Sequence, residues 1–230
     1  MKNILKRAFR SIRRTHIAVP ALGMGLLLLT GCATDGSRGP AAVEKAQVMT
    51  EGPSVTRLTD GREGFIISEV SSLNEDSREN FAHAVDLLNN QAYEDAIDLL
   101  KQVIDQSPGV TAPYIDIAVA YDQIGKSDEA EANIKIALEL VPNHPVASNE
   151  YGRLCRKSGR FDEARVIYEK ALGSFPEYYP LHRNLGILCD LYLNDPVSAL
   201  EHYRIYSRAM PEDRQVQLWI ADLSARTGSN

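Results

Sequence analysis

The sequence has few of the residues from which most active sites are built. It contains three cysteines, five histidines and one tryptophan in 230 residues. No pair of histidines stands at the i, i+4 spacing, with a third ligand nearby, that a zinc site uses. A glycine-rich phosphate loop and the strand-to-helix turn around a nucleophilic serine are both missing. We therefore expect a non-enzymatic protein without catalytic residues, metal or cofactor.

The N-terminal apolar segment is too short to cross a membrane. Residues 17–29 form a run of thirteen residues without charge, whereas a membrane-spanning helix needs about 20. Six Lys and Arg and no acid precede this run, which ends Leu29-Thr30-Gly31-Cys32. The pattern resembles the bacterial lipobox, in which cleavage precedes the cysteine and the cysteine is acylated. This resemblance implies a signal peptide at residues 1–31 and lipidation of Cys32. An ordinary signal peptide, or a membrane anchor with an incidental cysteine, is the alternative.

The residue after the cysteine and the charge of the mature chain bear on location and partners. Ala33 stands where an aspartate retains lipoproteins in the inner membrane of enteric-type bacteria. In a Gram-negative host we therefore expect an outer-membrane anchor on the periplasmic side, with inner-membrane retention as the alternative.

The mature chain has 19 Lys and Arg against 31 Asp and Glu, a net charge of −12. Such a surface repels phosphate backbones, which excludes nucleic acid as a partner.

A period of 34 or 35 residues organises the chain from residue 77 to residue 211. A small residue and a closing proline recur in register, and a bulky apolar residue follows four positions after each small one. The three series are Ala96, Ala130, Ala164 and Ala199; Pro108, Pro142, Pro176 and Pro211; and Leu100, Ile134, Tyr168 and Tyr203. Upstream, a large residue stands beside a small one at 83–84, 117–118, 151–152 and 185–186. The pattern resembles the tetratricopeptide repeat (TPR).

This resemblance implies an all-α solenoid of about four helix-turn-helix repeats with a C-terminal capping helix. The expected units are residues 77–110, 111–144, 145–178 and 179–212, followed by the cap at 213–226. Gly125 and Gly159 are expected just past helix ends, in the left-handed conformation. Asp195 and Pro196 are expected at the N-cap and the first position of a helix. His83 is expected at a core-facing position of the first unit.

Two segments precede the repeats. Residues 32–60 are rich in Gly, Pro, Ser, Thr and Ala without periodicity, which predicts a flexible tether that spans roughly 30 Å. Residues 61–76 contain an apolar cluster at 64–70. We favour a segment that packs on the first repeat and covers its exposed edge. A self-docking peptide or a partner-binding strand is the alternative.

Cys155 and Cys189 occupy the same position in adjacent units. Packed helices lie about 8–10 Å apart, and a disulfide needs Cα atoms within about 7 Å. We therefore predict two buried, unbridged thiols, with a bridge as the alternative in an oxidising compartment.

The TPR resemblance also implies a partner groove, because the inner wall of such arrays is built mainly from the first helix of each unit. We call these residues the inner wall: Phe81, Val85, Leu88, Ile115, Val119, Asn149, Arg153, Arg156, Lys157 and Arg183. One end of the wall is apolar and the other is basic. Since four like charges on one wall repel each other, we expect an acidic amphipathic helix or extended peptide of another envelope protein to bind there. A solvated basic face is the alternative.

The residues by which chaperone-binding TPRs clamp a C-terminal carboxylate are absent. Ile115, Val119, Glu150 and Pro180 stand at the corresponding places. A TPR array with a lipid anchor is similar instead to pilotins and pilus-assembly lipoproteins. This similarity implies a scaffold that assists assembly of a pilus or secretin. The alternatives are an adaptor of a TonB/ExbB-type energy-transducing complex and a lipoprotein activator of a cell-wall enzyme.

Overall fold

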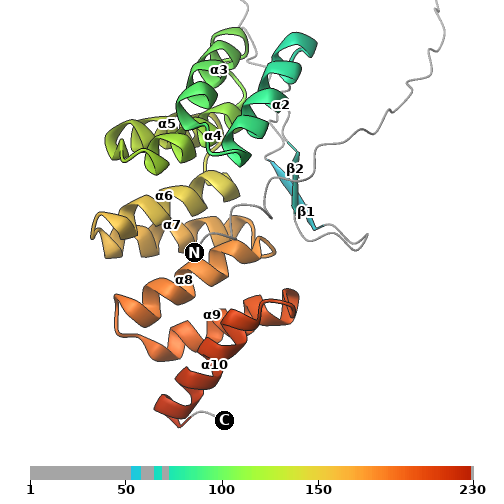
Figure 1. Cartoon of the computed structure of the whole chain (residues 1–230). Helices are drawn as coiled ribbons and strands as arrows, with labels where there is room; N and C mark the ends of the chain where they lie inside the picture. The colour runs from blue at the N-terminus through green and yellow to red at the C-terminus, as the bar shows by residue number, and fades with distance from the viewer. Residues whose placement is uncertain (1–52, 58–64, 69–72, 229–230) are drawn as a thin grey trace, which may run out of the picture.

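The computed structural model describes residues 53–57, 65–68 and 73–228. Within these residues the chain forms nine α-helices, α2 to α10, preceded by a hairpin of two short strands (Figure 1). No helix in the described ranges is long and apolar enough to cross a membrane. The predicted signal peptide and Cys32 lie outside the described residues, as does the tether before residue 53.

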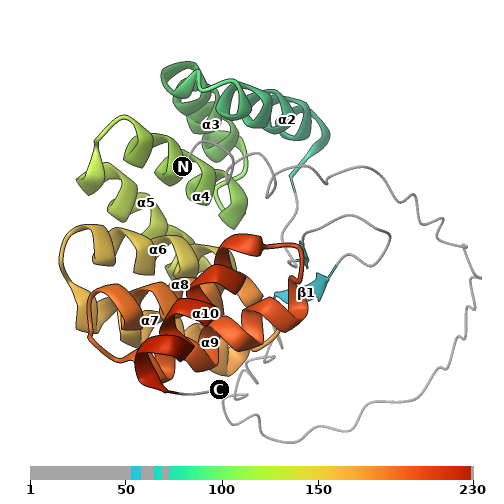
Figure 2. The same cartoon turned by 60° about the horizontal axis from the view of Figure 1, so that its bottom comes forward.

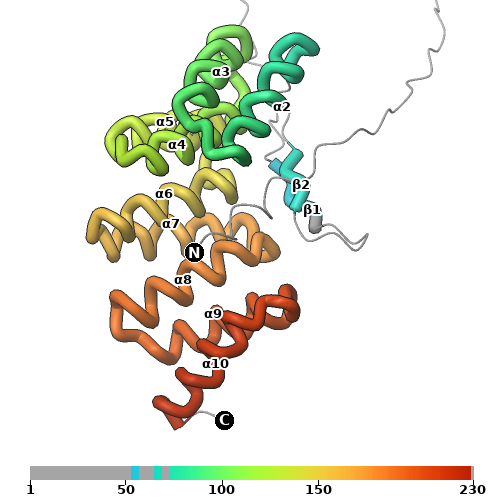
Figure 3. The backbone as a smooth tube through the Cα atoms, viewed as in Figure 1, coloured from blue at the N-terminus to red at the C-terminus, as the bar shows by residue number. Residues whose placement is uncertain are grey.

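The helices form consecutive pairs that stack in chain order (Figure 3). The pairs are α2 (Glu75–Asn89) with α3 (Tyr93–Gln106), α4 (Thr111–Gln123) with α5 (Ser127–Leu140), α6 (Pro145–Lys157) with α7 (Phe161–Ser174), and α8 (Tyr179–Leu191) with α9 (Pro196–Ala209). The single helix α10 (Arg214–Thr227) follows them. The predicted fold class, an all-α array of helix pairs with a last unpaired helix, is confirmed.

The two helices of a pair approach each other through a small residue that faces a large one. In the third and fourth pairs a glycine lies under a tyrosine ring: a Cβ atom on Gly152 would stand 2.3 Å from Cε1 of Tyr168, and one on Gly186 would stand 2.6 Å from Cδ1 of Tyr203. The first two pairs have alanines at this place, and their partners are Leu100 and Ile134, both fully buried. Glycine therefore faces the large tyrosine ring, and alanine faces the smaller leucine or isoleucine side chain.

The predicted helix ends are confirmed. Gly125 and Gly159 follow the first helices of the second and third pairs, with φ of +79° at both. This left-handed conformation costs glycine no steric clash, which is why it ends helices so often. Asp195 caps α9 by accepting a hydrogen bond from the Ser198 amide at 3.1 Å, and Pro196 is the first helical residue.

Cys155 and Cys189 are buried and free, as predicted. Cys155 lies in α6 and Cys189 in α8. Burial raises the pKa of the Cys155 thiol to about 12. A thiol with so high a pKa is almost entirely protonated at neutral pH and reacts slowly.

His83 is exposed, so the expectation of a core position is wrong. Its counterpart in the third pair, Tyr151, packs beside α5 of the preceding pair, where its hydroxyl donates to Glu131 at 3.3 Å. The helix of His83 is the first of the array, and no earlier helix stands among the described residues to cover it.

The two strands were not predicted as such. Strand β1 (Ser54–Arg57) pairs antiparallel with β2 (Phe65–Ser68), with Val55 opposite Ile67. The expectation of an irregular tether up to residue 60 is therefore wrong for residues 54–57. The expectation that the apolar segment packs on the first repeat is also wrong for residues 65–68, because β2 contacts the start of α8. Leu73, at the end of the segment, does pack on the first pair.

We predict that Gly186→Ala destabilises the protein. The new methyl group would overlap the ring of buried Tyr203, and overpacking of this kind costs about 1–3 kcal/mol. The better helix propensity of alanine offsets up to about 1 kcal/mol of this cost, so we expect the free energy of unfolding to fall by about 1 kcal/mol in urea titrations.

Gly173→Ala is the matched control. Gly173 lies in α7 with no atom within 4 Å of an added Cβ, so this change should leave stability equal or slightly higher. Equal stability of the two variants would contradict the close packing described here.

Candidate partner-binding site

The apolar half of the inner wall is mostly buried inside the array. Phe81 is 6% exposed and Ile115 is 4% exposed, and each packs within a hydrophobic cluster of the array itself. Val119 is 8% exposed, while Val85 and Leu88 are half-buried. The expectation that this half offers a broad apolar surface therefore needs correction, because its largest side chains are committed to the core.

The basic half of the inner wall is neutralised from within. Arg153 Nη1 lies 2.7 Å from Asp122 Oδ2, and Arg153 Nε lies 2.8 Å from Glu150 Oε2. Lys157 Nζ lies 2.7 Å from Asp122 Oδ1. Burial of Asp122 works to raise the pKa of its carboxyl, but hydrogen bonds from Lys157 and Arg153 outweigh this and lower the pKa below its usual range. Asp122 is therefore charged at neutral pH and holds both cations.

The two remaining arginines of this half also have partners. Arg183 Nε lies 3.5 Å from Asp213 Oδ2, and its guanidinium stands 5.2 Å from the centre of the Trp219 ring. Arg156 lies 5.9 Å from the ring centre of Tyr192. The expectation that an acidic partner is needed to offset four like charges is thus wrong for Arg153, Lys157 and Arg183, which already lie against carboxylates of the array. Asp122 could have been found from the sequence, because it precedes Arg153 and Lys157 by about one repeat length.

Polar contacts between residues about one repeat apart continue along the inner wall. The Asn184 side-chain amide donates to Asn149 Oδ1 at 2.8 Å, which satisfies the buried Asn149. Farther along, Arg226 of α10 donates to Asp190 Oδ1 at 3.1 Å. These bonds join consecutive first helices, so the inner wall helps to hold neighbouring units together.

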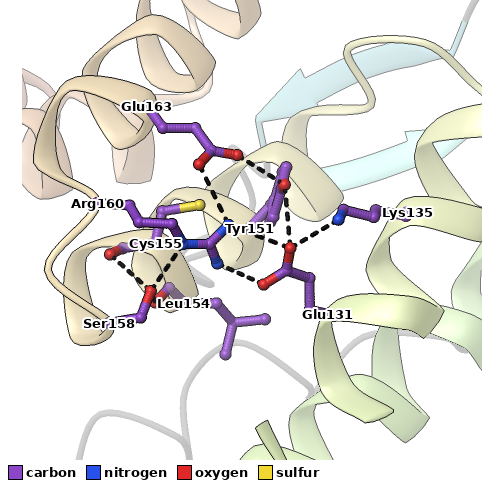
Figure 4. A network of polar contacts seen from close by, with 8 residues as sticks. All are labelled: Glu131, Lys135, Tyr151, Leu154, Cys155, Ser158, Arg160 and Glu163. Atoms are coloured by element: carbon purple, nitrogen blue, oxygen red, sulfur yellow. Dashed lines mark hydrogen bonds and ion pairs between the residues drawn. The ribbon is translucent and has the colours of Figure 1, made fainter. Parts of the chain in front are cut away.

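A second polar network joins the second and third pairs away from the inner wall (Figure 4). Glu131 of α5 receives hydrogen bonds from Arg160, at the start of α7, and an ion pair from Lys135 at 2.7 Å. Tyr151 donates to Glu163 at 2.8 Å. The hydrogen bonds from Arg160, followed by those from Lys135, outweigh partial burial and lower the pKa of Glu131 to about 2.

The same place between the third and fourth pairs holds an ion pair of opposite polarity. Arg165 occupies the repeat position of Glu131, and Asp195 occupies that of Arg160. Arg165 Nη2 lies 2.7 Å from Asp195 Oδ2. The two junctions therefore use the same geometry with the charges exchanged.

A pair of histidines lies between α8 and α9. His182 Nδ1 is 2.9 Å from His202 Nδ1, and His182 Nε2 is 3.3 Å from the Pro176 carbonyl oxygen. Burial, and then the neighbouring ring, lower the pKa of His182 to about 4. Both rings are therefore neutral at neutral pH, and one Nδ1 donates to the other. The pair was missed because its members stand 20 residues apart on different helices. No group of three potential metal ligands occurs in the described part of the chain.

The hairpin rests on the start of α8. The Phe65 ring lies 5.1 Å from that of Tyr178 in an edge-on arrangement and 6.1 Å from that of Tyr179. Val55 and Ile67, on the same face of the hairpin, pack against the same hydrophobic cluster of the third and fourth pairs. The opposite face carries two serines, a threonine and Ile66, all exposed. Figures 1 and 2 both show the hairpin beside the array, between its two ends.

The hairpin depends on the array for its order. An isolated two-stranded hairpin is marginally stable at best in water. Val55, Phe65 and Ile67 are each only half-buried, and half-burial of such a side chain contributes about 1 kcal/mol. The contact with α8 is therefore sufficient to hold the hairpin and weak enough to be broken without unfolding the helices.

The comparison with known proteins agrees with the repeat geometry. Sequence profiles of the tetratricopeptide repeat match residues 87–149 and 147–178. Residues 87–178 thus match tetratricopeptide repeats, and the helix pairs before and after them repeat the same arrangement. TPR arrays are typically non-catalytic scaffolds, and TPR domains bind peptides of other proteins.

Several solved TPR structures share this fold. PilF of Pseudomonas aeruginosa is 21% identical with a TM-score of 0.62, over 66% of this chain and 69% of PilF. PilW, described as a widely conserved type IV pilus biogenesis factor, is 22% identical with a TM-score of 0.60, over 67% and 71% of the two chains. MamA of Desulfovibrio magneticus RS-1 is 18% identical with a TM-score of 0.57, over 68% and 88%. Identities of this size show a common fold.

The array also matches a region of a much longer protein. Mouse protein O-mannosyl-transferase TMTC3 is 26% identical over 156 residues, which covers 61% of this chain and 16% of the mouse protein. The chain thus spans about a sixth of the length of this relative.

We predict that Arg153→Glu destabilises the TPR array strongly. The substitution would remove a cation from buried Asp122 and place a third carboxylate beside Asp122 and Glu150. Breaking a buried ion pair costs about 3–5 kcal/mol, and partial exposure of Arg153 reduces this to about 2–3 kcal/mol. Urea unfolding at neutral pH measures the loss.

Arg156→Glu is the matched control, since Arg156 lies on the same helix and contacts an aromatic ring instead of Asp122. It should change stability by less than about 1 kcal/mol. An equal loss in both variants would contradict the assignment of Asp122 as the anchor of the basic half.

Proposed function

We propose that this protein is a lipid-anchored TPR scaffold of the bacterial envelope that assists assembly of a pilus or secretin. The observation that carries the proposal is the array fold shared over about two thirds of the chain with PilW, a type IV pilus biogenesis factor. The lipobox-like sequence at residues 29–32 supports a membrane anchor. The acidic mature chain favours protein partners over nucleic acid.

The anchor is the first part of the proposal. Acylation of Cys32 with several chains would hold the protein stably on a membrane, whereas one chain binds only marginally. Ala33 supports the outer membrane on its periplasmic side. The residues between Cys32 and the hairpin would then set how far the array reaches from the membrane.

Cys32→Ala should leave the precursor unprocessed and without lipid. The thioether that carries the first acyl group cannot form on alanine, and cleavage before residue 32 depends on that modification. Metabolic labelling with a fatty acid, followed by gel analysis and mass measurement of the N-terminus, tests this. Ala33→Ser is the control and should keep the label. Label on the alanine variant would exclude Cys32 as the lipid site.

The inner wall is the second part of the proposal. Lys157 is 53% exposed although it also bonds Asp122, and the half-buried Arg156 precedes it on the same wall. An acidic peptide of another envelope protein would contact these two cations, which would set its orientation and association rate more than its affinity. Exposed pairs contribute only about 0.2–1 kcal/mol each, so apolar contacts would supply most of the affinity.

Site-specific photo-crosslinking in cells tests the scaffold function. A photoreactive residue at position 157 should capture a pilus or secretin component. One at Lys101, which is similarly exposed at 54% but lies on the second helix of the first pair, should not capture it. Capture of the same proteins from both positions, or of none from position 157, would contradict a working inner wall.

A further inference from the structure

The array already carries an extended segment of its own chain. The hairpin residues that face the array alternate along each strand, and the residues between them face away. In β2, the Phe65 ring rests on Tyr178 and Tyr179 of the array, and Ile67 lies on the same face of the strand. We call the surface beneath them, formed by Tyr178 and Tyr179, the strand seat. It presents two aromatic side chains at the first turn of α8, beside the polar inner wall.

The hairpin is held at this seat less firmly than a permanent structural strand would be. None of its strand residues with described side chains is buried, and Ile66 is 43% exposed on the outward face. Strands that belong to a core usually bury one complete face. Each strand here has four residues and a single strand partner, so release of the hairpin would leave every helix pair intact.

We propose that the hairpin is a resident occupant of the docking site for a partner, and that the partner binds by displacing it. This inference rests on the proposed scaffold function and names the partner class: an extended segment with an aromatic and an aliphatic side chain at alternate positions, as in Phe65 and Ile67. Such a segment reproduces the contacts that the seat already makes. An amphipathic helix would place its apolar residues at spacings of three and four instead and would not match them.

Competition by the hairpin has a measurable consequence. When only a fraction of molecules has an open seat, the apparent dissociation constant of any competing ligand equals the intrinsic constant divided by that fraction. A variant that weakens the hairpin contact should therefore bind a competing segment more tightly. This gain is unusual for a substitution that removes an apolar side chain, and it separates displacement from a purely structural role.

The test uses the full chain and a fluorescein-labelled synthetic peptide with the sequence of residues 53–68. Phe65→Ala should bind this peptide at least about tenfold more tightly than the wild-type chain, because its own hairpin no longer occupies the seat. Ile66→Ala is the matched control: it lies on the same strand with its side chain facing away, and it should bind as the wild type does. Adding Tyr179→Ala to Phe65→Ala should remove the gain.

Thermal melts and far-ultraviolet circular dichroism establish that the variants remain folded, and hydrogen exchange at residues 54–57 and 65–68 reports release of the hairpin directly. Equal peptide affinity of the wild type and Phe65→Ala would overturn the proposal. So would an equal gain for Ile66→Ala, because the effect would then not depend on the seat.

Crosslinking from position 157 separates this inference from the scaffold function. In Phe65→Ala cells the yield of the captured partner should rise. An unchanged yield would overturn displacement by the partner and leave the scaffold function in place. Capture of no partner in either background would overturn the scaffold function, while the peptide titration would still decide whether the seat exchanges its occupant.

Discussion

The structure depends on the close approach of the two helices in each pair. They meet at a position where the first helix carries glycine or alanine. The ring of Tyr168 occupies the space that a Cβ atom on Gly152 would need. This contact brings α6 and α7 together, and because it recurs at intervals of about 34 residues, it gives each pair the same shape. Equal pairs stack regularly, and regular stacking aligns the first helices into a continuous wall. The strand seat and the ion pairs between units follow from that alignment.

The charges of the array mainly hold it together. The Asp122 side chain is almost fully buried, with 3% of it exposed, and forms ion pairs with two cations of the next unit. Isolated surface pairs add little stability, but a buried carboxylate held by two donors is costly to disturb. The basic half of the wall therefore serves mainly to join neighbouring units. The exposed part of Lys157, and the strand seat once the hairpin leaves it, are the surfaces that we propose for recognition.

Most of the fold could be predicted from the sequence, because the repeat is encoded locally and several times over. Helix ends at Gly125, Gly159 and Asp195 follow from residue types that act within one turn. The failures concern contacts that no local pattern encodes. The pairing of His182 with His202 needs the register between helices, whereas the pairing of Asp122 with Arg153 was overlooked although the repeat length indicates it. The exposure of His83 is an end effect, and the place where Phe65 docks depends on contacts more than 100 residues away along the chain.

The exchanged ion pairs between units fix the order in which the units can follow one another. Repeat arrays change length in evolution by loss or duplication of whole units, and identical junctions would tolerate this. Here, loss of residues 145–178 would bring Glu131 opposite Asp195, so that two carboxylates would meet where an ion pair now stands. A tandem copy of the same unit would likewise bring Arg165 opposite a second Arg160. The third unit is thus an adapter between neighbours of unlike charge, and the array is a heteropolymer of units that cannot be shuffled freely.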